Sequence, residues 1–190
     1  MQISAKQVGS ACRAEGASAA RTPGVIRVSG LTKNSIVDGP GIRFVVFGQG
    51  CPLKCPDCHN PSTHDFFGGE LMDISDIVAQ IESDPLLDGV TFSGGEPFAQ
   101  AVAFAELAAR LPHHHIMCYS GYTFDELYSR SQSKQGDDIR ALLSRIDVLV
   151  DGRFDSVRKT YDAKFKGSTN QRAIDVKESL QHGKAIEISL

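Results

Sequence analysis

Apolar residues along this chain recur at two spacings, and the two spacings alternate. Short β-rich runs, typical of buried strands, lie at 43–47, 89–92, 115–119 and 147–151. Segments with helical spacing lie at 73–83, 97–111, 123–130 and 139–145. The apolar face of the first helix consists of Ile74, Ile77, Val78 and Ile81. Asp73 is a suitable N-cap for this helix, and Thr123 with Glu126 has the spacing of a capping box.

This alternation predicts parallel strands joined by right-handed helical crossovers. A complete eight-stranded β/α barrel typically needs about 250 residues, whereas this chain has 190. The expected fold class is therefore α/β, an open or partial parallel β/α barrel formed by one domain, residues 24–190. Residues 1–23 are small and polar, and we expect a flexible leader there. Arg13 and Arg21 leave an organelle-targeting role open for it.

Composition and charge exclude several classes of function. A formal net charge of −3 and the absence of Trp give no reason to expect nucleic-acid or anionic membrane binding. The apolar runs are too short to span a bilayer, and the N-terminus lacks the apolar region of a secretory signal. We therefore expect a cytoplasmic protein in a reducing compartment. Five cysteines, an odd count, argue against a disulfide framework there.

Three of those cysteines, Cys51, Cys55 and Cys58, lie within eight residues in a loop after the first predicted strand. Such soft thiolates favour zinc, copper(I) or an iron–sulfur cluster. A structural zinc site needs a fourth ligand. The candidates are His59, His64 and Cys118, although His59 adjoins Cys58 and Cys118 is better explained as a buried small hydrophobe. A [4Fe–4S] cluster held by three cysteines instead leaves its fourth iron open to a ligand.

Other polar or glycine-rich loops follow the later strands and should meet the cysteine loop at one rim, since sites gather at the carboxyl ends of parallel strands. In Ser93-Gly94-Gly95-Glu96, the glycines allow close backbone approach, and the carbonyls and Glu96 could accept from an ammonium group; a plain turn is the alternative. Tyr119 and Ser120 could line the same pocket or simply end a strand. Asp151 could face a ribose or a cation, or form an Asp-Gly turn. The run 113–115, three histidines, is interpreted as a solvated loop.

The C-x3-C-x2-C triplet followed by SGGEP resembles the radical S-adenosylmethionine enzymes. The resemblance implies that Cys51, Cys55 and Cys58 ligate a [4Fe–4S] cluster. It also implies that the fourth iron chelates the methionine moiety of S-adenosylmethionine, and that the SGGE segment binds its amino group. Asp57 stands where many members carry an aromatic residue beside the adenine, which leaves the adenine contact open. The fold implied is the partial barrel of the radical S-adenosylmethionine type.

Further segments resemble the glycyl-radical-enzyme activating proteins: 34–43 (NSIVDGPGIR) and HNP after the third cysteine. YSGYTFDEL, DVLVDGRF and KGSTNQRAIDV are most similar to the activating proteins of anaerobic ribonucleoside-triphosphate reductase. This implies a one-electron reductive cleavage of S-adenosylmethionine to a 5′-deoxyadenosyl radical. That radical abstracts a glycine α-hydrogen from the large reductase. A reduced flavodoxin or ferredoxin is the implied electron donor, and no acid–base dyad is implied.

Three alternatives remain at this point. The chain could activate pyruvate formate-lyase or another glycyl radical enzyme, because the early motifs are shared. Radical synthases of the deazaguanine type share GGEP but fit 34–43 poorly. A zinc-stabilised binding module would use the triplet structurally. Lys164, Lys166 and the other basic residues of 153–172 could help dock the reductase or form an ordinary solvated face.

Overall fold

The computed structural model describes residues 23–190. The leader expected at 1–23, including Cys12, therefore lies outside the described residues except for its last position. The strands are β1 (Val25–Ser35), β2 (Arg43–Gly48), β3 (Glu70–Asp73), β4 (Gly89–Gly94), β5 (His115–Ser120), β6 (Val148–Asp151) and β7 (Arg172–Asp175). The α-helices are α1 (Ile74–Glu82), α2 (Ala101–Ala109), α3 (Phe124–Ser131), α4 (Asp137–Leu143) and α5 (Val176–His182). Short 3-10 turns are η1 (Pro61–His64), η2 (Pro97–Gln100) and η3 (Ser156–Arg158).

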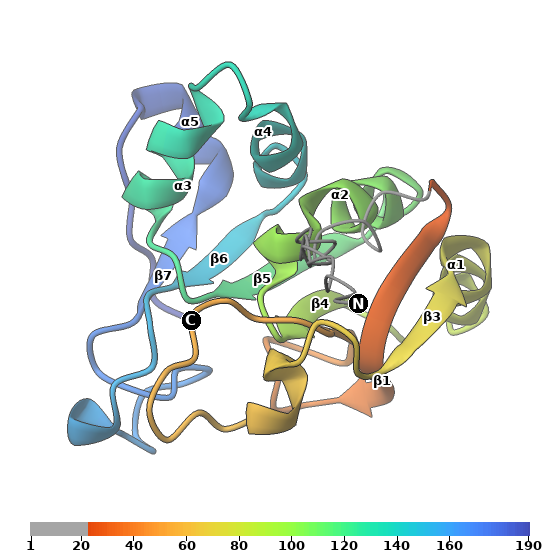
Figure 1. Ribbon diagram of the computed structural model, residues 1–190, viewed down its shortest axis with the longest axis horizontal. Helices are drawn as coiled ribbons and strands as arrows, with labels where there is room; N and C mark the ends of the chain where they lie inside the picture. The colour runs from red at the N-terminus through yellow and green to blue at the C-terminus, as the bar shows by residue number, and fades with distance from the viewer. Residues whose placement is uncertain (1–22) are drawn as a thin grey trace, which may run out of the picture.

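All the strands belong to one sheet in the order β3-β1-β2-β4-β5-β6-β7 (Figure 1). The predicted parallel strands are confirmed as its centre, since β2, β4, β5 and β6 pair in parallel. The expectation of a purely parallel sheet is wrong. β1 and β3 on one side and β7 on the other pair antiparallel with their neighbours. The structure is thus a mixed α/β sheet with helical crossovers between its parallel strands.

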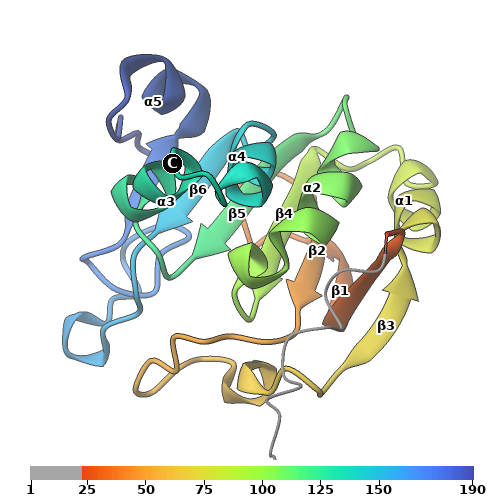
Figure 2. The ribbon, with the colours of Figure 1, turned by 45° about the horizontal axis from the view of Figure 1, so that its top comes forward.

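The helices cover one face of this sheet, and the main hydrophobic core lies between the two layers (Figure 2). Phe92 of β4 and Phe104 of α2 meet there with their ring centroids 4.8 Å apart. Alternate residues of the strands point to the other face. There Met117, Val148 and Val150 form a smaller cluster with Tyr119 and residues of the C-terminal segment. The sheet therefore has one fully covered face and one partly covered face, and its loops lie at the edges.

The buried side chain of Arg43 requires glycine at nearby positions, including one in the glycine-rich segment that precedes β2. Its guanidinium is buried at the amino ends of the parallel strands. There it donates to Thr91 Oγ1 (2.9 Å) and to the His115 carbonyl (3.0 Å). Burial lowers the pKa of Arg43 to about 10. A Cβ on Gly39 or Gly89 would collide with the Arg43 side chain, so these glycines make room for it. This segment lies at the opposite end of the strands from the cysteine loop.

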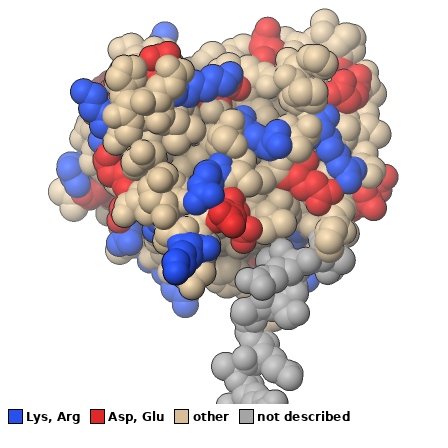
Figure 3. Space-filling model, turned by 90° about the horizontal axis from the view of Figure 1, so that it is seen from above, with Lys and Arg blue, Asp and Glu red and all other residues tan. Residues whose placement is uncertain are grey.

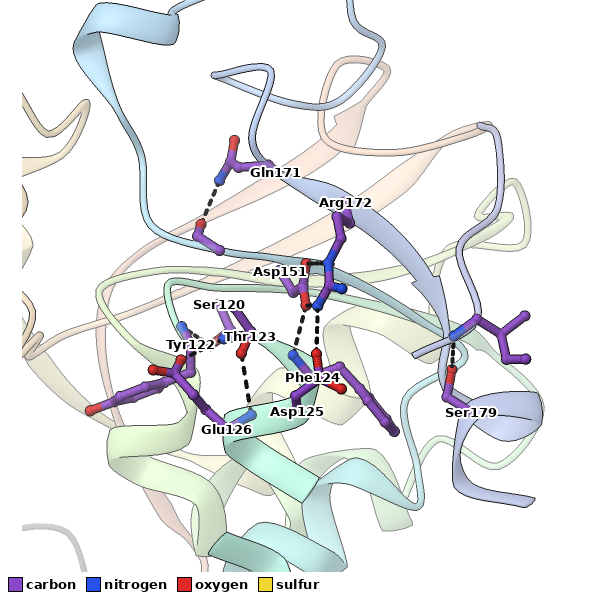
Figure 4. A network of polar contacts seen from close by, with 12 residues as sticks. Ser120, Tyr122, Thr123, Phe124, Asp125, Glu126, Asp151, Gln171, Arg172 and Ser179 are labelled. Atoms are coloured by element: carbon purple, nitrogen blue, oxygen red, sulfur yellow. Dashed lines mark hydrogen bonds and ion pairs between the residues drawn. The ribbon is translucent and has the colours of Figure 1, made fainter. Parts of the chain in front are cut away.

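Two predicted helix starts are confirmed by their caps. The Asp73 carboxylate accepts from Ser75 N (2.7 Å) at the start of α1. At α3, Thr123 Oγ1 accepts from Glu126 N (3.2 Å), while the Glu126 carboxylate accepts from Thr123 N (2.8 Å) (Figure 4). These reciprocal bonds satisfy two amides that the helix itself cannot pair. The helix predicted from Pro97 differs slightly, because it opens as the 3-10 turn η2 before α2 begins.

Replacing Thr123 with Ala should lower the free energy of unfolding by about 1 kcal/mol, since an N-cap side chain is lost. Thermal or denaturant unfolding followed by circular dichroism measures this change. Ser129→Ala is the matched control, because Ser129 is exposed inside the same helix and alanine is the better helix former there. Equal stabilities for Thr123→Ala and the native chain would contradict the capping role.

Across residues 23–190, no helix has both the length and the apolar character needed to cross a membrane. On the face seen in Figure 3, basic and acidic side chains are interspersed, and neither sign forms an extended patch.

Candidate functional site

The loops that leave the carboxyl ends of β2, β4, β5 and β6 meet at one end of the sheet. The long loops 49–69 and 152–171 both lie there, as Figures 1 and 2 show from two directions. One cavity is bordered by all four loops. Its lining includes the three clustered cysteines, Ser93–Glu96, Tyr119 and Ser120. The structure thus brings these predicted site residues together, while their roles as ligands stay predictions.

The cysteine loop folds back on its own start. Gly50 N donates to the Thr63 carbonyl (2.8 Å), and Cys51 N donates to the His64 carbonyl (3.3 Å). The Gln49 amide donates to the carbonyls of Ser62 (3.0 Å) and Asp65 (2.6 Å), which closes the loop from the other side. The loop therefore has a fixed frame around its three thiols, which lie on the segment between these contacts.

Two residues between the cysteines, Lys54 and Asp57, have positive φ angles of 47° and 55°. Such left-handed turns are costly outside glycine and cluster at functional sites. Here they bend the chain tightly between the first and third cysteines. The backbone is thereby wrapped around the space that the thiols border.

The thiols lie in surroundings that disfavour charge. Burial raises the pKa of Cys51, and burial together with the nearby Cys58 raises the pKa of Cys55. All four described cysteines are free thiols. Holding Cys51 and Cys55 as thiolates therefore requires a strongly positive partner, such as bound iron, and binding it would release protons.

The arrangement fits a cluster better than a single metal ion. Within residues 23–190, no three side chains among His, Cys, Asp and Glu are grouped so that they could hold one metal ion. The cavity of about 160 Å³ is roughly ten times the 10–15 Å³ that one water needs. A cuboidal cluster takes one thiolate per iron, so its ligands need not converge on one point. Cys118, a suggested zinc ligand, is instead buried in the core between sheet and helices.

The glycines of the SGGE segment allow it to lie directly against the cysteine loop. Gly95 N donates to the Gly48 carbonyl (2.8 Å), and Glu96 N donates to the Gly50 carbonyl (2.9 Å). A Cβ on Gly95 would collide with the Gly50 carbonyl, and Gly94 has a φ of 92°. The two loops therefore form one cradle, in which side chains at these positions would fill the space between them.

Comparison with known proteins agrees with this site. The model of a family described as "4Fe-4S single cluster domain" matches residues 37–174. An anaerobic ribonucleoside-triphosphate reductase-activating protein of Vibrio cholerae is 34% identical over 146 residues, which cover 72% of this chain and 89% of the relative. The chain belongs to this family of activating proteins.

Two other relatives differ in how much of their length this chain matches. The protein of the same name from Haemophilus influenzae is 31% identical over 148 residues, covering 72% of this chain and 89% of the relative. The pyruvate formate-lyase-activating enzyme of Clostridium pasteurianum is 43% identical, but only over 79 residues, 39% of this chain and 33% of that enzyme. The reductase-activating proteins are thus matched over far more of their own length than the pyruvate formate-lyase-activating enzyme is.

Glu96 has a different set of partners in this activating protein from those expected. Its buried carboxylate accepts from Ser120 Oγ (3.0 and 3.1 Å), Gly121 N (2.9 Å) and Phe98 N (3.0 Å). These bonds tie the loop after β4 to the loop after β5. The acceptors left for an ammonium group are thus mainly backbone carbonyls of the segment, while the Glu96 side chain fixes their position.

Burial raises the pKa of Glu96 to about 7, even though the hydrogen bonds from Phe98, Gly121 and Ser120 favour the ionised form. The native state therefore binds a proton more tightly than the unfolded chain, whose ordinary value is 4.5. Stability should fall as the pH rises from about 4.5 to about 7, by up to about 3 kcal/mol. Glu96→Gln should lack this decline.

Thermal unfolding of the anaerobic apoprotein between pH 5 and pH 8 measures the effect. Glu70→Gln is the control, since Glu70 is exposed on β3, and it should retain the native pH dependence. A Glu96→Gln variant with the native slope would show that another group titrates in this range.

Asp151 has a structural role in the fold. Its buried carboxylate accepts from Arg172 Nε (3.0 Å) and Nη2 (2.6 Å) and from Phe124 N (2.7 Å) (Figure 4). These bonds join β6 to β7 and to the start of α3. The suggested contact of Asp151 with a ribose or cation has no support in this geometry. Arg172 is likewise engaged here, which removes it from the set of basic residues proposed for docking.

Asp57 is exposed and does not border the cavity, so its suggested place beside the adenine is unsupported. Phe154 and His59 both line the cavity, and their ring centroids lie 4.3 Å apart. Neither Phe154 nor Gln171, another lining residue, was predicted from the sequence. Gln171 lies in the KGSTNQ segment, and the family resemblance of that segment could have indicated Gln171 as a site residue. In the histidine run, the His114 ring contacts the Glu82 carboxylate (3.2 Å), and the His115 ring contacts the Arg43 guanidinium (3.3 Å).

Proposed function

We propose that this protein is a radical S-adenosylmethionine enzyme that generates the glycyl radical of anaerobic ribonucleoside-triphosphate reductase. The observation that carries the proposal is the shared cavity of Cys51, Cys55, Cys58 and the SGGE segment. It occurs in a chain 34% identical to an activating protein of that name. The cofactors are a [4Fe–4S] cluster and S-adenosylmethionine.

The bound cluster supplies the electron that cleaves S-adenosylmethionine, so that the resulting 5′-deoxyadenosyl radical removes a glycine α-hydrogen from the partner. The protein supplies binding, geometry and exclusion of water. Cys51, Cys55 and Cys58 hold the cluster, and the carbonyls of the SGGE segment accept from the amino group of the methionine moiety. Glu96 and Ser120 keep that segment in place through their hydrogen bond. Tyr119 forms part of the cavity wall.

The open sheet supports a protein partner. We infer that its four parallel strands correspond to the partial barrel of the radical S-adenosylmethionine type, whose rim admits a glycine-bearing loop. A reduced flavodoxin or ferredoxin in the cytoplasm is the proposed electron donor. The proposed docking role of the basic stretch narrows to side chains that form no ion pair within residues 23–190, such as the exposed Lys164, because Arg158 pairs with Asp155 and Arg172 with Asp151.

A pyruvate formate-lyase activator is the second candidate, and the extent of the matches favours the reductase. The two kinds of relative match over 89% and 33% of their own lengths. The deciding experiment mixes anaerobic holoprotein, S-adenosylmethionine and reductant with each purified glycyl radical enzyme. Electron paramagnetic resonance should then show a glycyl radical on the reductase. A radical on pyruvate formate-lyase alone would favour the second candidate, and colourless protein containing one zinc would favour a binding module.

A further inference from the structure

His64, suggested from the sequence only as a fourth ligand of a zinc site, is a residue of the cysteine loop. It ends the turn η1 and lines the cavity that the three cysteines border. Its Nε2 atom is shielded from solvent and has no hydrogen-bond partner among the described residues. A buried polar group without a partner costs about 1–3 kcal/mol. Such an atom, in a residue that lines a ligand cavity, needs a partner that the described residues do not supply, and the group that fills the cavity is the candidate.

The backbone fixes His64 beside the first cysteine. Its carbonyl accepts from Cys51 N (3.3 Å), and the adjacent Thr63 carbonyl accepts from Gly50 N (2.8 Å). Thr63 is buried, and its hydroxyl donates to the Asn60 carbonyl (2.7 Å). The imidazole therefore extends from a restrained backbone next to the Cys51 side of the cavity.

The chemistry of this cavity determines what His64 can bind. A neutral imidazole protonated at Nε2 is a hydrogen-bond donor. Cysteine thiolates and inorganic sulfides are acceptors, and hydrogen bonds to these sulfurs are one of the factors that set the reduction potential of a cluster.

We propose that His64 donates a hydrogen bond from Nε2 to a sulfur of the cluster and thereby raises the reduction potential of that cluster. The proposal rests on the proposed function, because it requires a cluster on Cys51, Cys55 and Cys58. The reduced cluster carries one more negative charge than the oxidised cluster, so the donor stabilises the reduced form more. His64 thus makes the cluster easier for its electron donor to reduce, and it acts by tuning the cluster without ligating it.

The test compares anaerobically reconstituted native protein with His64→Leu, His64→Gln and His113→Leu. Iron and sulfide are quantified first, and the cluster is then titrated with a redox buffer in the absence of S-adenosylmethionine, followed by electron paramagnetic resonance. For His64→Leu, the ratio of reduced to oxidised cluster at a fixed potential should fall about tenfold, which equals about 59 mV for a one-electron couple. His64→Gln retains an N–H donor and should restore part of the shift. His113 is exposed and far along the chain, so His113→Leu should match the native protein.

Two results would overturn the proposal. One is a His64→Leu protein with a full cluster and the native potential. The other is a shift that appears only when S-adenosylmethionine is present, because His64 would then serve that cosubstrate. If His64→Leu assembles no cluster, a second experiment tests the hydrogen bond in protein whose histidines carry isotopic nitrogen. Pulsed electron paramagnetic resonance of the reduced native protein should show a histidine nitrogen weakly coupled to the cluster. The same signal should remain in His59→Leu, which excludes His59 as its source, and absence of the signal would refute the hydrogen bond. A native protein that assembles no cluster would refute the proposed function instead.

Discussion

Replacing Cys58 with Ser should abolish the reductive cleavage of S-adenosylmethionine by this protein. A serine hydroxyl is a hard and weakly acidic ligand, whereas iron–sulfur clusters need soft thiolates. With only Cys51 and Cys55 left, two irons of the cluster would lack a protein ligand. We expect iron and sulfide to fall from about four of each per chain to a small residue, with loss of the brown colour. Methionine and 5′-deoxyadenosine should not be released above the background of a mixture without protein.

Cys58, like Cys55 and unlike the buried Cys51, is only half-buried, so the substitution should leave the fold intact. Circular dichroism should confirm the native fold of the variant. Cys118→Ala is the matched control, since Cys118 is a buried free thiol of the core that does not line the cavity. It should retain iron, sulfide and cleavage while losing about 1 kcal/mol of stability. A Cys58→Ser protein that keeps a full cluster and full cleavage would refute the assignment of the ligands.

The central part of the fold was predictable because its signals are local. Strands buried on both faces are continuous apolar runs, and helix caps depend on residues three apart. The strands missed were β1, β3 and β7, which flank the sheet. β3 and β7 contain only four residues each, and β1 carries a bulge beside Gly30. Their place is determined by antiparallel pairing with distant segments, which periodicity alone does not reveal.

The candidate site shows the same division between local and distant signals. The cysteine triplet and the SGGEP segment could be found from spacing, and the order of the strands then predicted their meeting. The partners of the buried carboxylates could not be found in that way. Glu96 bonds to Ser120, 24 residues later, and Asp151 bonds to Arg172, 21 residues later. A ligand role was therefore predicted for Glu96 and left open for Asp151, whereas the hydrogen bonds of both carboxylates in this structure go to groups of the protein.

The second large effect is expected at Gly94, where alanine should damage both stability and cofactor binding. Gly94 has a φ of 92°, and a Cβ there would lie 2.6 Å from the Gly48 carbonyl oxygen and 2.7 Å from Gly48 N. The left-handed backbone costs about 1–2 kcal/mol for an L-residue. The overlap adds about 1–3 kcal/mol. The melting temperature should therefore fall by roughly 5–15 °C.

The overlap has a consequence for function because Gly48 is the residue at which β2 passes into the cysteine loop. Pushing β4 away from β2 at this point stretches the bonds from Gly95 N to Gly48 and from Glu96 N to Gly50. These bonds keep the SGGE carbonyls beside the cluster cysteines, so S-adenosylmethionine should bind at least about tenfold more weakly, a loss of ~1.4 kcal/mol. Calorimetric titration of the reconstituted protein measures this affinity. Gly30→Ala is the control, since a Cβ on Gly30 meets nothing within 4 Å. Native stability and native affinity in Gly94→Ala would mean that the close approach of the two loops is not required, and the cradle would then have no part in holding the cosubstrate.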